Sequence, residues 1–363
     1  MKIKLFYLVV YLAIILPITA FSSNIINPKN GVLSTNGTLV WYEAALLGVE
    51  GKGWTNTISD YGRLPITAKK KVRKAIWDIG KFPSGFLVRF KTNAKTINVN
   101  WILTNPELAV LHMPATGVSG IDLYARNKEG VLRFCANGRP HSISNNVKFT
   151  LPVSQEYVIY FPTYNELKSL KIGIPKGKYL SKVSPPTPSI VFYGTSITEG
   201  GCASRPGMIT TSIIGRKLGI SIINMGFSGN GTMETEVADV ISELNPVIYV
   251  LDPLWNMTPK MVSDRAEPFV KELRKNRPTT PIILVEDSNF NDLPTEKGDI
   301  LRKIYAKLIK EGDKNLYFLS NKNMLGTDGE ATVDGCHFSD LGMMRQADAY
   351  IKYLKPMLKK ISQ

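Results

Sequence analysis

The chain of 363 residues contains 44% hydrophobic and 21% charged residues, and its formal net charge at pH 7 is +15. This balance excludes an intrinsically disordered chain and a membrane protein with several spans, and the length suffices for two domains. With only three cysteines and three histidines, a disulfide-dense scaffold and a histidine-rich metal site are also excluded.

The first 22 residues are typical of a secretion signal. Lys2 and Lys4 precede an apolar stretch at residues 5–16, and residues 20–22 (Ala-Phe-Ser) have the small residues that signal peptidase requires. Because the apolar stretch is short for a membrane span, we expect a signal peptide at residues 1–22 and no span in the mature chain. An uncleaved anchor is the alternative. The protein is therefore predicted to be secreted or periplasmic.

Residues 23–180 are predicted to form an antiparallel β-sandwich domain. Short runs that alternate apolar and polar residues lie at residues 86–90, 97–101, 121–124 and 157–161. A period of two is typical of strands with one face in a core and the other in solvent. Four of the five tryptophans lie in this half and are interpreted as core residues, with a sugar-stacking platform as the alternative: Trp41, Trp54, Trp77 and Trp101.

Two segments in this part of the chain have an unusual composition. The basic run at residues 69–74 could suggest a nucleic-acid surface, but in a secreted chain we interpret it as a solvated segment. No nucleic-acid partner is therefore expected. Residues 181–189 contain three prolines in nine positions, which fits neither a helix nor a central strand. They are predicted to be a stiff linker.

Residues 190–363 are predicted to form a three-layer α/β/α domain around a doubly wound, flavodoxin-like parallel sheet. Continuous apolar runs, which are typical of strands buried on both faces, lie at residues 190–193, 220–223, 247–251, 282–285 and 316–319. Amphipathic segments between them, and one after the last run, have the helical spacing of apolar residues. A ligand site is expected at the carboxyl ends of the strands.

Each of the first three strands of this domain is followed by a residue suited to ester chemistry. Ser196 follows the first strand, Gly229 lies in a glycine-rich loop after the second, and Asn256 follows the third. A serine hydroxyl can act as a nucleophile, and inward-facing N–H groups can stabilise an oxyanion. The alternatives are a helix-capping serine and a dinucleotide-binding loop, and the spacing Gly-x-x-Gly-x-Gly disfavours the second.

An aspartate and a histidine lie three residues apart near the C-terminus, at Asp334 and His337. In a tight turn, the aspartate can accept a hydrogen bond from the imidazole Nδ1–H, which leaves Nε2 free as a base. Because His112 and His141 lie in the sandwich half, His337 is expected to be the only histidine at the site.

Taken together, these segments resemble the four sequence blocks of the SGNH (GDSL-type) hydrolases. The resemblance is closest to the subgroup with an N-terminal β-sandwich marked by Gly-x-Asp-Leu-Tyr, here residues 120–124. Arg63-Leu64-Pro65 also resembles that subgroup. The first block is Gly-Thr-Ser in place of Gly-Asp-Ser, and the third lacks the Gly-x-Asn-Asp motif. The blocks lie at residues 190–198, 226–229, 256 and 334–337.

The resemblance implies the roles of the candidate residues. Ser196 would be the nucleophile, His337 the base, and Asp334 the carboxylate that orients the base. The N–H groups of Ser196 and Gly229 and the amide of Asn256 would form the oxyanion hole. Neither a metal ion nor an organic cofactor would be needed.

We therefore expect a secreted serine esterase that hydrolyses O-acyl esters, above all acetyl esters on carbohydrates, through an acyl-enzyme. Its partner would be an acylated small molecule or polysaccharide. The sequence predicts no particular oligomeric state. A glycan O-acyltransferase with the same triad and a non-catalytic glycan-binding protein are the alternatives.

Cys202 and Cys336 are predicted to form a disulfide. The two segments that contain them must meet at the site, and the expected compartment is oxidising. Cys135 would then be the one free thiol. The alternative is a reactive thiol at Cys336, which is adjacent to His337.

Overall fold

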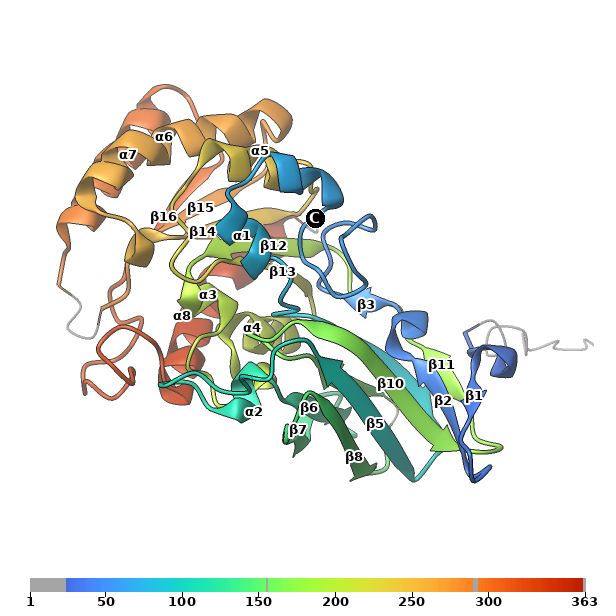
Figure 1. Cartoon of the computed structure of the whole chain (residues 1–363). Helices are drawn as coiled ribbons and strands as arrows, with labels where there is room; N and C mark the ends of the chain where they lie inside the picture. Colours follow the sequence, from blue (N-terminus) through green and yellow to red (C-terminus); the bar gives the residue numbers. More distant parts are fainter. Residues whose placement is uncertain (1–23, 155, 290–292, 362–363) are drawn as a thin grey trace, which may run out of the picture.

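The computed structural model describes residues 24–154, 156–289 and 293–361, so the predicted signal peptide lies outside the described residues. Two antiparallel sheets with a shared apolar core confirm the expected β-sandwich, and an α/β domain follows it (Figure 1). One sheet has the order β1 (Val32–Leu33), β2 (Leu39–Glu43), β10 (Leu167–Pro175), β5 (Thr96–Leu103) and β8 (Ser144–Thr150). The other has the order β11 (Leu180–Lys182), β4 (Leu87–Thr92), β9 (Tyr157–Tyr160), β6 (Ile121–Arg126) and β7 (Leu132–Gly138), with β3 (Val49–Glu50) paired to β4.

The second domain contains a five-stranded parallel sheet, as predicted. Its order is β13 (Ser221–Gly226), β12 (Ser189–Gly194), β14 (Ile248–Asp252), β15 (Ile282–Val285) and β16 (Leu316–Leu319). This is the flavodoxin-like order, in which the chain winds in both directions from its first strand, β12. The strands are apolar on both sides because helices cover both faces.

Each face of this sheet has its own helical layer. Side chains of α5 (Thr235–Ser242), α6 (Pro259–Asn276) and α7 (Glu296–Lys310) share one core with one face of the sheet. Side chains of α4 (Thr210–Leu218) and α8 (Asp340–Ile361) share a second core with the other face. The remaining short elements are α2 (Ala115–Val118), α3 (Ser196–Glu199), η2 (Pro28–Asn30), η3 (Ala44–Leu47), η5 (Pro206–Met208) and η6 (Leu254–Asn256). No helix in the described part of the chain is long and apolar enough to cross a membrane.

Much of the segment between β3 and β4, residues 51–84, packs against the α/β domain, although Tyr61 is buried in the sandwich core. It contains η4 (Ile66–Lys70) and α1 (Lys74–Ile79), and Figure 1 shows α1 close to α5. Leu64, Ile76 and Trp77 are buried in the same core as α5 and α6. The assignment of residues 23–180 to one sandwich domain stays a prediction, and part of this segment lies in the core of the α/β domain. Alternation of apolar residues identifies strands, but it does not indicate which domain an intervening helix contacts.

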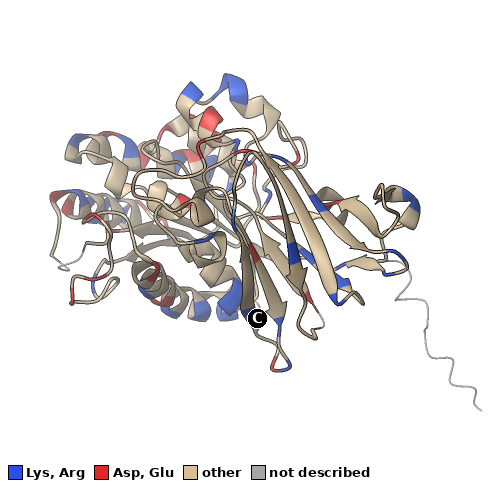
Figure 2. Cartoon of the chain, turned by 60° about the horizontal axis from the view of Figure 1, so that its bottom comes forward, with Lys and Arg blue, Asp and Glu red and all other residues tan. Residues whose placement is uncertain are grey.

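The basic run at residues 69–74 belongs to this segment. Lys71 lies 2.8 Å from Asp239 and Arg73 lies 2.6 Å from Glu234, and both acidic residues are in or next to α5. The two basic side chains remain partly exposed, so each ion pair stabilises the contact only modestly. In the view of Figure 2, Lys and Arg residues are distributed over both the helices and the strands rather than along a single stripe.

The Gly-x-Asp-Leu-Tyr segment supplies a second contact between the domains. Asp122, fully buried in β6, accepts hydrogen bonds from the Arg205 guanidinium at 2.9 Å and from the Gly207 N–H at 2.8 Å. Burial raises the pKa of Asp122, and these donors, together with Asn137, act against the rise. The aspartate therefore fixes the loop after α3 against the sandwich.

The tryptophans of the N-terminal half are divided between the cores of the two domains. Trp101 is fully buried in the sandwich, whereas Trp77 is buried in the α/β domain. Trp54 packs against the α/β core and its indole N–H donates to Glu243 at 2.9 Å. The core interpretation is confirmed for Trp101 and Trp77, whereas Trp54 is only partly buried.

Candidate active site

The candidate residues come together at the carboxyl ends of the parallel strands. Ser196 begins α3 directly after β12, and Gly229 lies in the loop after β13. Asn256 ends η6 after β14, and Asp334 and His337 lie in the loop between β16 and α8. The first two loops are in direct contact, because the Phe227 N–H donates to the Gly194 carbonyl at 3.0 Å.

Three side chains form a continuous hydrogen-bonded chain. Ser196 Oγ lies 2.9 Å from His337 Nε2, and His337 Nδ1 lies 2.7 Å from an Asp334 carboxylate oxygen. An ionised carboxylate can only accept, so His337 donates from Nδ1 and its Nε2 is left to accept the serine proton. The structure therefore joins residues that are 141 positions apart in the sequence.

Asp334 is held in its ionised form by the turn in which it lies. Its Oδ1 accepts the N–H groups of Cys336 at 2.9 Å and His337 at 2.7 Å. Partial burial acts to raise the pKa of Asp334, but the hydrogen bonds from the His337 ring and from these N–H groups outweigh it and lower the pKa to about 2. The carboxylate is thus negatively charged at neutral pH.

The nucleophile candidate is positioned by the start of a helix. Ser196 is the first residue of α3 and is only 7% exposed. The Thr195 hydroxyl accepts the Ile197 N–H at 3.2 Å, whereas the Ser196 N–H, as the first in the helix, has no intrahelical acceptor. The hydroxyl and the N–H of one residue are therefore both available at the same end of the sheet.

Gly229 has the backbone conformation that the loop after β13 requires. Its φ is +66°, a value that side-chain-bearing residues adopt only at a cost. Within the described part of the chain, no hydrogen bond uses its N–H. Two residues later, a Cβ on Gly231 would lie 2.1 Å from the Gly194 carbonyl oxygen, so only glycine allows this loop to approach β12 so closely.

The side-chain amide of Asn256 is oriented by the same loop. Its Oδ1 accepts the Gly231 N–H at 3.3 Å, which leaves the NH₂ end of the amide free to donate. Each of the three loops that follow β12, β13 and β14 thus contains a neutral donor group: the N–H of Ser196, the N–H of Gly229 and the amide of Asn256.

We expect Asn256→Ala to lower kcat for ester hydrolysis by about 10²–10³-fold, the usual cost of losing one oxyanion donor. KM should change little, because the donor is needed most when negative charge develops on the carbonyl oxygen. Steady-state kinetics with p-nitrophenyl acetate would measure both constants. Asn245→Ala, on the surface of the same domain, is the control. An unchanged kcat in Asn256→Ala would remove this residue from the oxyanion hole.

The sandwich domain contributes two side chains, His112 and Tyr164, to the surroundings of Ser196 and His337. The position of His112 differs from the expectation for this site. His112 lies with its ring centroid 5.1 Å from that of His337, so His337 is not the only histidine at the site. Tyr164 donates from its hydroxyl to the Ser196 carbonyl oxygen at 3.0 Å. Neither residue could be located from the sequence, because both lie in loops of the other domain. The only signal in the sequence was that histidine is rare, with three in the chain, and it could have drawn attention to His112 alone.

The predicted disulfide is not formed, and Cys202, Cys336 and Cys135 are all free thiols. Cys202 Sγ lies within 4.8 Å of ligand nitrogens of His112 and His337. Burial, together with the acidic groups Asp334 and Cys336 nearby, raises the pKa of the Cys202 thiol to about 12. Burial raises the pKa of Cys336 as well. Neither thiol is therefore activated as a nucleophile, which disfavours the thiol-enzyme alternative.

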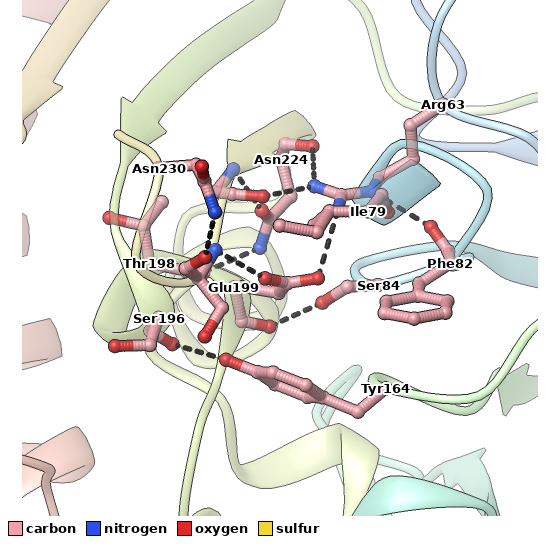
Figure 3. Close-up of polar contacts among 12 residues, drawn as sticks. Arg63, Ile79, Phe82, Ser84, Tyr164, Ser196, Thr198, Glu199, Asn224 and Asn230 are labelled. Atoms are coloured by element: carbon pink, nitrogen blue, oxygen red, sulfur yellow. Dashed lines mark hydrogen bonds and ion pairs between the residues drawn. The ribbon is translucent and has the colours of Figure 1, made fainter. Parts of the chain in front are cut away.

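A buried ion pair lies beneath the loops of the site (Figure 3). The side chains of Arg63 and Glu199 are 3.0 Å apart and both are 0% exposed. Glu199 also accepts the Ser228 N–H at 2.9 Å, directly before Gly229. Arg63 also donates to the carbonyl oxygens of Gly226 and Asn224, at 2.7 and 3.2 Å. The pair thus connects the last residue of α3 to the end of β13 and to the loop that contains Gly229.

Comparisons with known proteins agree with this architecture. A model of the GDSL-like lipase/acylhydrolase family matches residues 187–355, and a model of the N-terminus of SGNH-hydrolase-type esterases, GxDLY, matches residues 39–180. A structure described as a GDSL-like lipase from Bacteroides ovatus shares 30% identity at a TM-score of 0.83, over 88% of this chain and 98% of that chain. No curated protein matches this chain.

Two further solved structures share the fold at lower identity. A salicylyl acyltransferase from a tetracycline biosynthetic pathway is 17% identical with a TM-score of 0.67, over 90% of this chain and 97% of that chain. A family two carbohydrate esterase from Clostridium thermocellum is 15% identical with a TM-score of 0.54, over 76% of this chain and 93% of that chain.

Proposed function

The chain belongs to the GDSL-like lipase/acylhydrolase family and is an ester hydrolase, and from this premise we propose that it is a secreted serine esterase that removes O-acetyl groups from carbohydrates. The observation that supports the mechanism best is the hydrogen-bonded chain from Ser196 Oγ through the His337 ring to Asp334. Hydroxyl, imidazole and carboxylate are linked in the order that serine hydrolysis requires.

In the proposed reaction, Ser196 Oγ attacks the ester carbonyl carbon while its proton passes to His337 Nε2. The N–H groups of Ser196 and Gly229 and the Asn256 amide would donate to the oxygen that becomes negative. When the intermediate collapses, the sugar oxygen leaves and takes the proton from His337. Water, deprotonated by the same imidazole, then releases acetate and restores the serine. Asp334 stabilises the imidazolium and fixes its tautomer throughout.

Three observations support the substrate class. The low exposure of Ser196 favours a small acyl group over a long chain. The amino-terminal segment resembles a secretion signal, which agrees with a substrate outside the cell. Two family two carbohydrate esterases share the fold over much of this chain, and this enzyme class is named for carbohydrate esters. The similar fold of the salicylyl acyltransferase makes acyl transfer to a sugar hydroxyl the second candidate.

A fluorophosphonate probe tests the nucleophile directly. We expect the probe to form a single covalent adduct, with loss of fluoride, on the peptide that contains Ser196. Ser196→Ala should form none, and Ser221→Ala, at the opposite end of β13, should be labelled like the wild type. Intact and peptide mass spectrometry would measure the adducts. Equal labelling of Ser196→Ala would contradict the assignment.

Acetylated oligosaccharides then distinguish hydrolysis from transfer. Acetate release in the absence of an acceptor supports the esterase. A product that forms only when a second sugar is added supports the transferase. A comparison of p-nitrophenyl acetate with the butyrate and octanoate esters should give the highest kcat/KM for acetate.

A further inference from the structure

A second set of side chains at the edge of the site has the chemistry of a cation site. His112, Cys202 and His337 each offer one ligand atom, and the three atoms all lie within 4.8 Å of one another. The three residues come from three separate segments: the loop before α2, the loop after α3, and the loop before α8. Two imidazoles and one thiol form a donor set that Zn²⁺ prefers in proteins.

The His337 ring is already oriented as a metal-binding histidine would be. Its Nδ1 donates to Asp334 at 2.7 Å, so Nε2 is the nitrogen left for a cation. Metal-ligating histidines commonly donate their other ring nitrogen to a carboxylate in this way, which fixes the tautomer and increases the basicity of the ligand. The hydrogen bond that orients His337 as the proposed general base therefore also orients its Nε2 as a metal ligand.

The other two ligands differ in exposure to solvent. Cys202 is buried beside Met113, Val118 and Tyr164, and its φ of +69° is unusual for a residue with a side chain. Such a conformation is unfavourable for a residue with a side chain and is often found at functional sites. His112 is exposed and lies in a loop. In a tetrahedral zinc site the ligand atoms are about 3.3–3.6 Å apart, so the three ligand atoms must move closer together when a cation binds.

We propose that His112, Cys202 and His337 bind Zn²⁺, or another thiophilic divalent cation, and that this binding reversibly inhibits the enzyme. The cation occupies His337 Nε2, the atom that accepts the Ser196 proton, so the bound enzyme has no general base. The Cys202 thiol proton passes to solvent as the thiolate binds. The fourth position on the cation remains for water or another small ligand. The inhibition rests on the proposed function, whereas the binding does not.

The test measures binding and activity separately. Enzyme freed of metal with EDTA and transferred to metal-free buffer is titrated with Co²⁺, and absorption is recorded for the thiolate-to-cobalt charge-transfer band and the intense visible bands of a tetrahedral site. We expect both sets of bands for the wild type, and no charge-transfer band for Cys202→Ala or Cys202→Ser. His141→Ala and Cys135→Ala are the matched controls, because their side chains lie in the sandwich domain away from this cluster, and they should behave like the wild type.

Zn²⁺ titration of p-nitrophenyl acetate hydrolysis gives the second readout, with each variant compared with its own activity without zinc. The inhibitory zinc concentration should rise at least about tenfold in His112→Ala and in Cys202→Ala, since even an outer-shell partner is worth about 10–100-fold in metal affinity. EDTA should restore activity. Equal zinc sensitivity in all variants, or the absence of a thiolate band in the wild type, would overturn the proposal. Failure of every ester assay would contradict the proposed function alone, because the cobalt spectra would still report on the site.

Discussion

Replacing Ser196 by alanine is expected to lower kcat for p-nitrophenyl acetate by about 10⁴–10⁶-fold, the range found when a nucleophilic serine is removed from a triad. The physical reason is that no other nucleophilic group takes the place of the Ser196 hydroxyl beside His337. The Ser196 hydroxyl is hydrogen-bonded to His337 Nε2 at 2.9 Å, and the thiols nearby are kept protonated by their surroundings. Without Oγ, no acyl-enzyme can form, and only hydrolysis assisted by the remaining donors is left.

The same substitution should leave the fold intact, which makes the result interpretable. The structural contacts of Ser196 use its backbone: its carbonyl oxygen accepts from the Tyr164 hydroxyl of the other domain and from the N–H groups of Gly200 and Gly201 in its own domain. Alanine preserves all three. The urea midpoint of Ser196→Ala should therefore stay close to that of the wild type. Ser221→Ala is the control for both activity and stability, and more than a tenth of wild-type activity in Ser196→Ala would contradict the mechanism.

The features of the site that follow from chain order could be predicted from the sequence. Ser196, Gly229 and Asn256 each follow a strand with a continuous apolar run, and parallel strands bring their carboxyl ends to one edge. Asp334 and His337 are close in sequence, so a single tight turn sets their contact. In these cases a local pattern and one rule of sheet topology were enough.

The features that depend on contact between the domains could not be predicted in this way. His112 and Tyr164 lie in loops of the sandwich, and their contact with α3 and His337 depends on how one domain packs on the other. The position of residues 51–84 also depends on how the domains pack, because no local sequence pattern indicates which core they join. The predicted disulfide was wrong for a related reason. The two segments do meet, but Cys202 and Cys336 are free thiols, and the geometry that a disulfide requires is not specified by sequence spacing.

Arg63→Met is expected to lower the free energy of unfolding by about 3–5 kcal/mol, because it leaves the Glu199 carboxylate buried without its partner. Methionine fills much of the volume of the arginine stem, so the loss reports mainly on polar contacts. The guanidinium makes five hydrogen bonds, to Glu199 and to the carbonyl oxygens of residues 79, 82, 224 and 226. Arg63→Lys should recover little, since one ammonium group cannot reach all of these acceptors.

The pH dependence distinguishes loss of the ion pair from loss of packing. Burial raises the pKa of Glu199, and the Arg63 charge and the Ser228 N–H act against the rise. Without Arg63 the folded-state pKa should rise further above its unfolded value. The folded state would then bind the proton more tightly than the unfolded state, so the deficit of Arg63→Met should shrink as the pH is lowered and grow as it is raised. A deficit independent of pH would indicate packing alone.

A double variant separates the charge from the hydrogen bonds. Arg63→Met combined with Glu199→Gln removes the uncompensated carboxylate, so it should be more stable than Arg63→Met at neutral pH. It should remain less stable than the wild type, because the Gly226 and Asn224 carbonyl oxygens stay buried without donors. Arg139→Met, on the exposed surface of the sandwich, should change the free energy of unfolding by less than about 0.5 kcal/mol. Urea unfolding at several pH values would measure all four proteins. If Arg63→Met loses less than about 1 kcal/mol at neutral pH, the buried pair does not hold the loop of Gly229 in place.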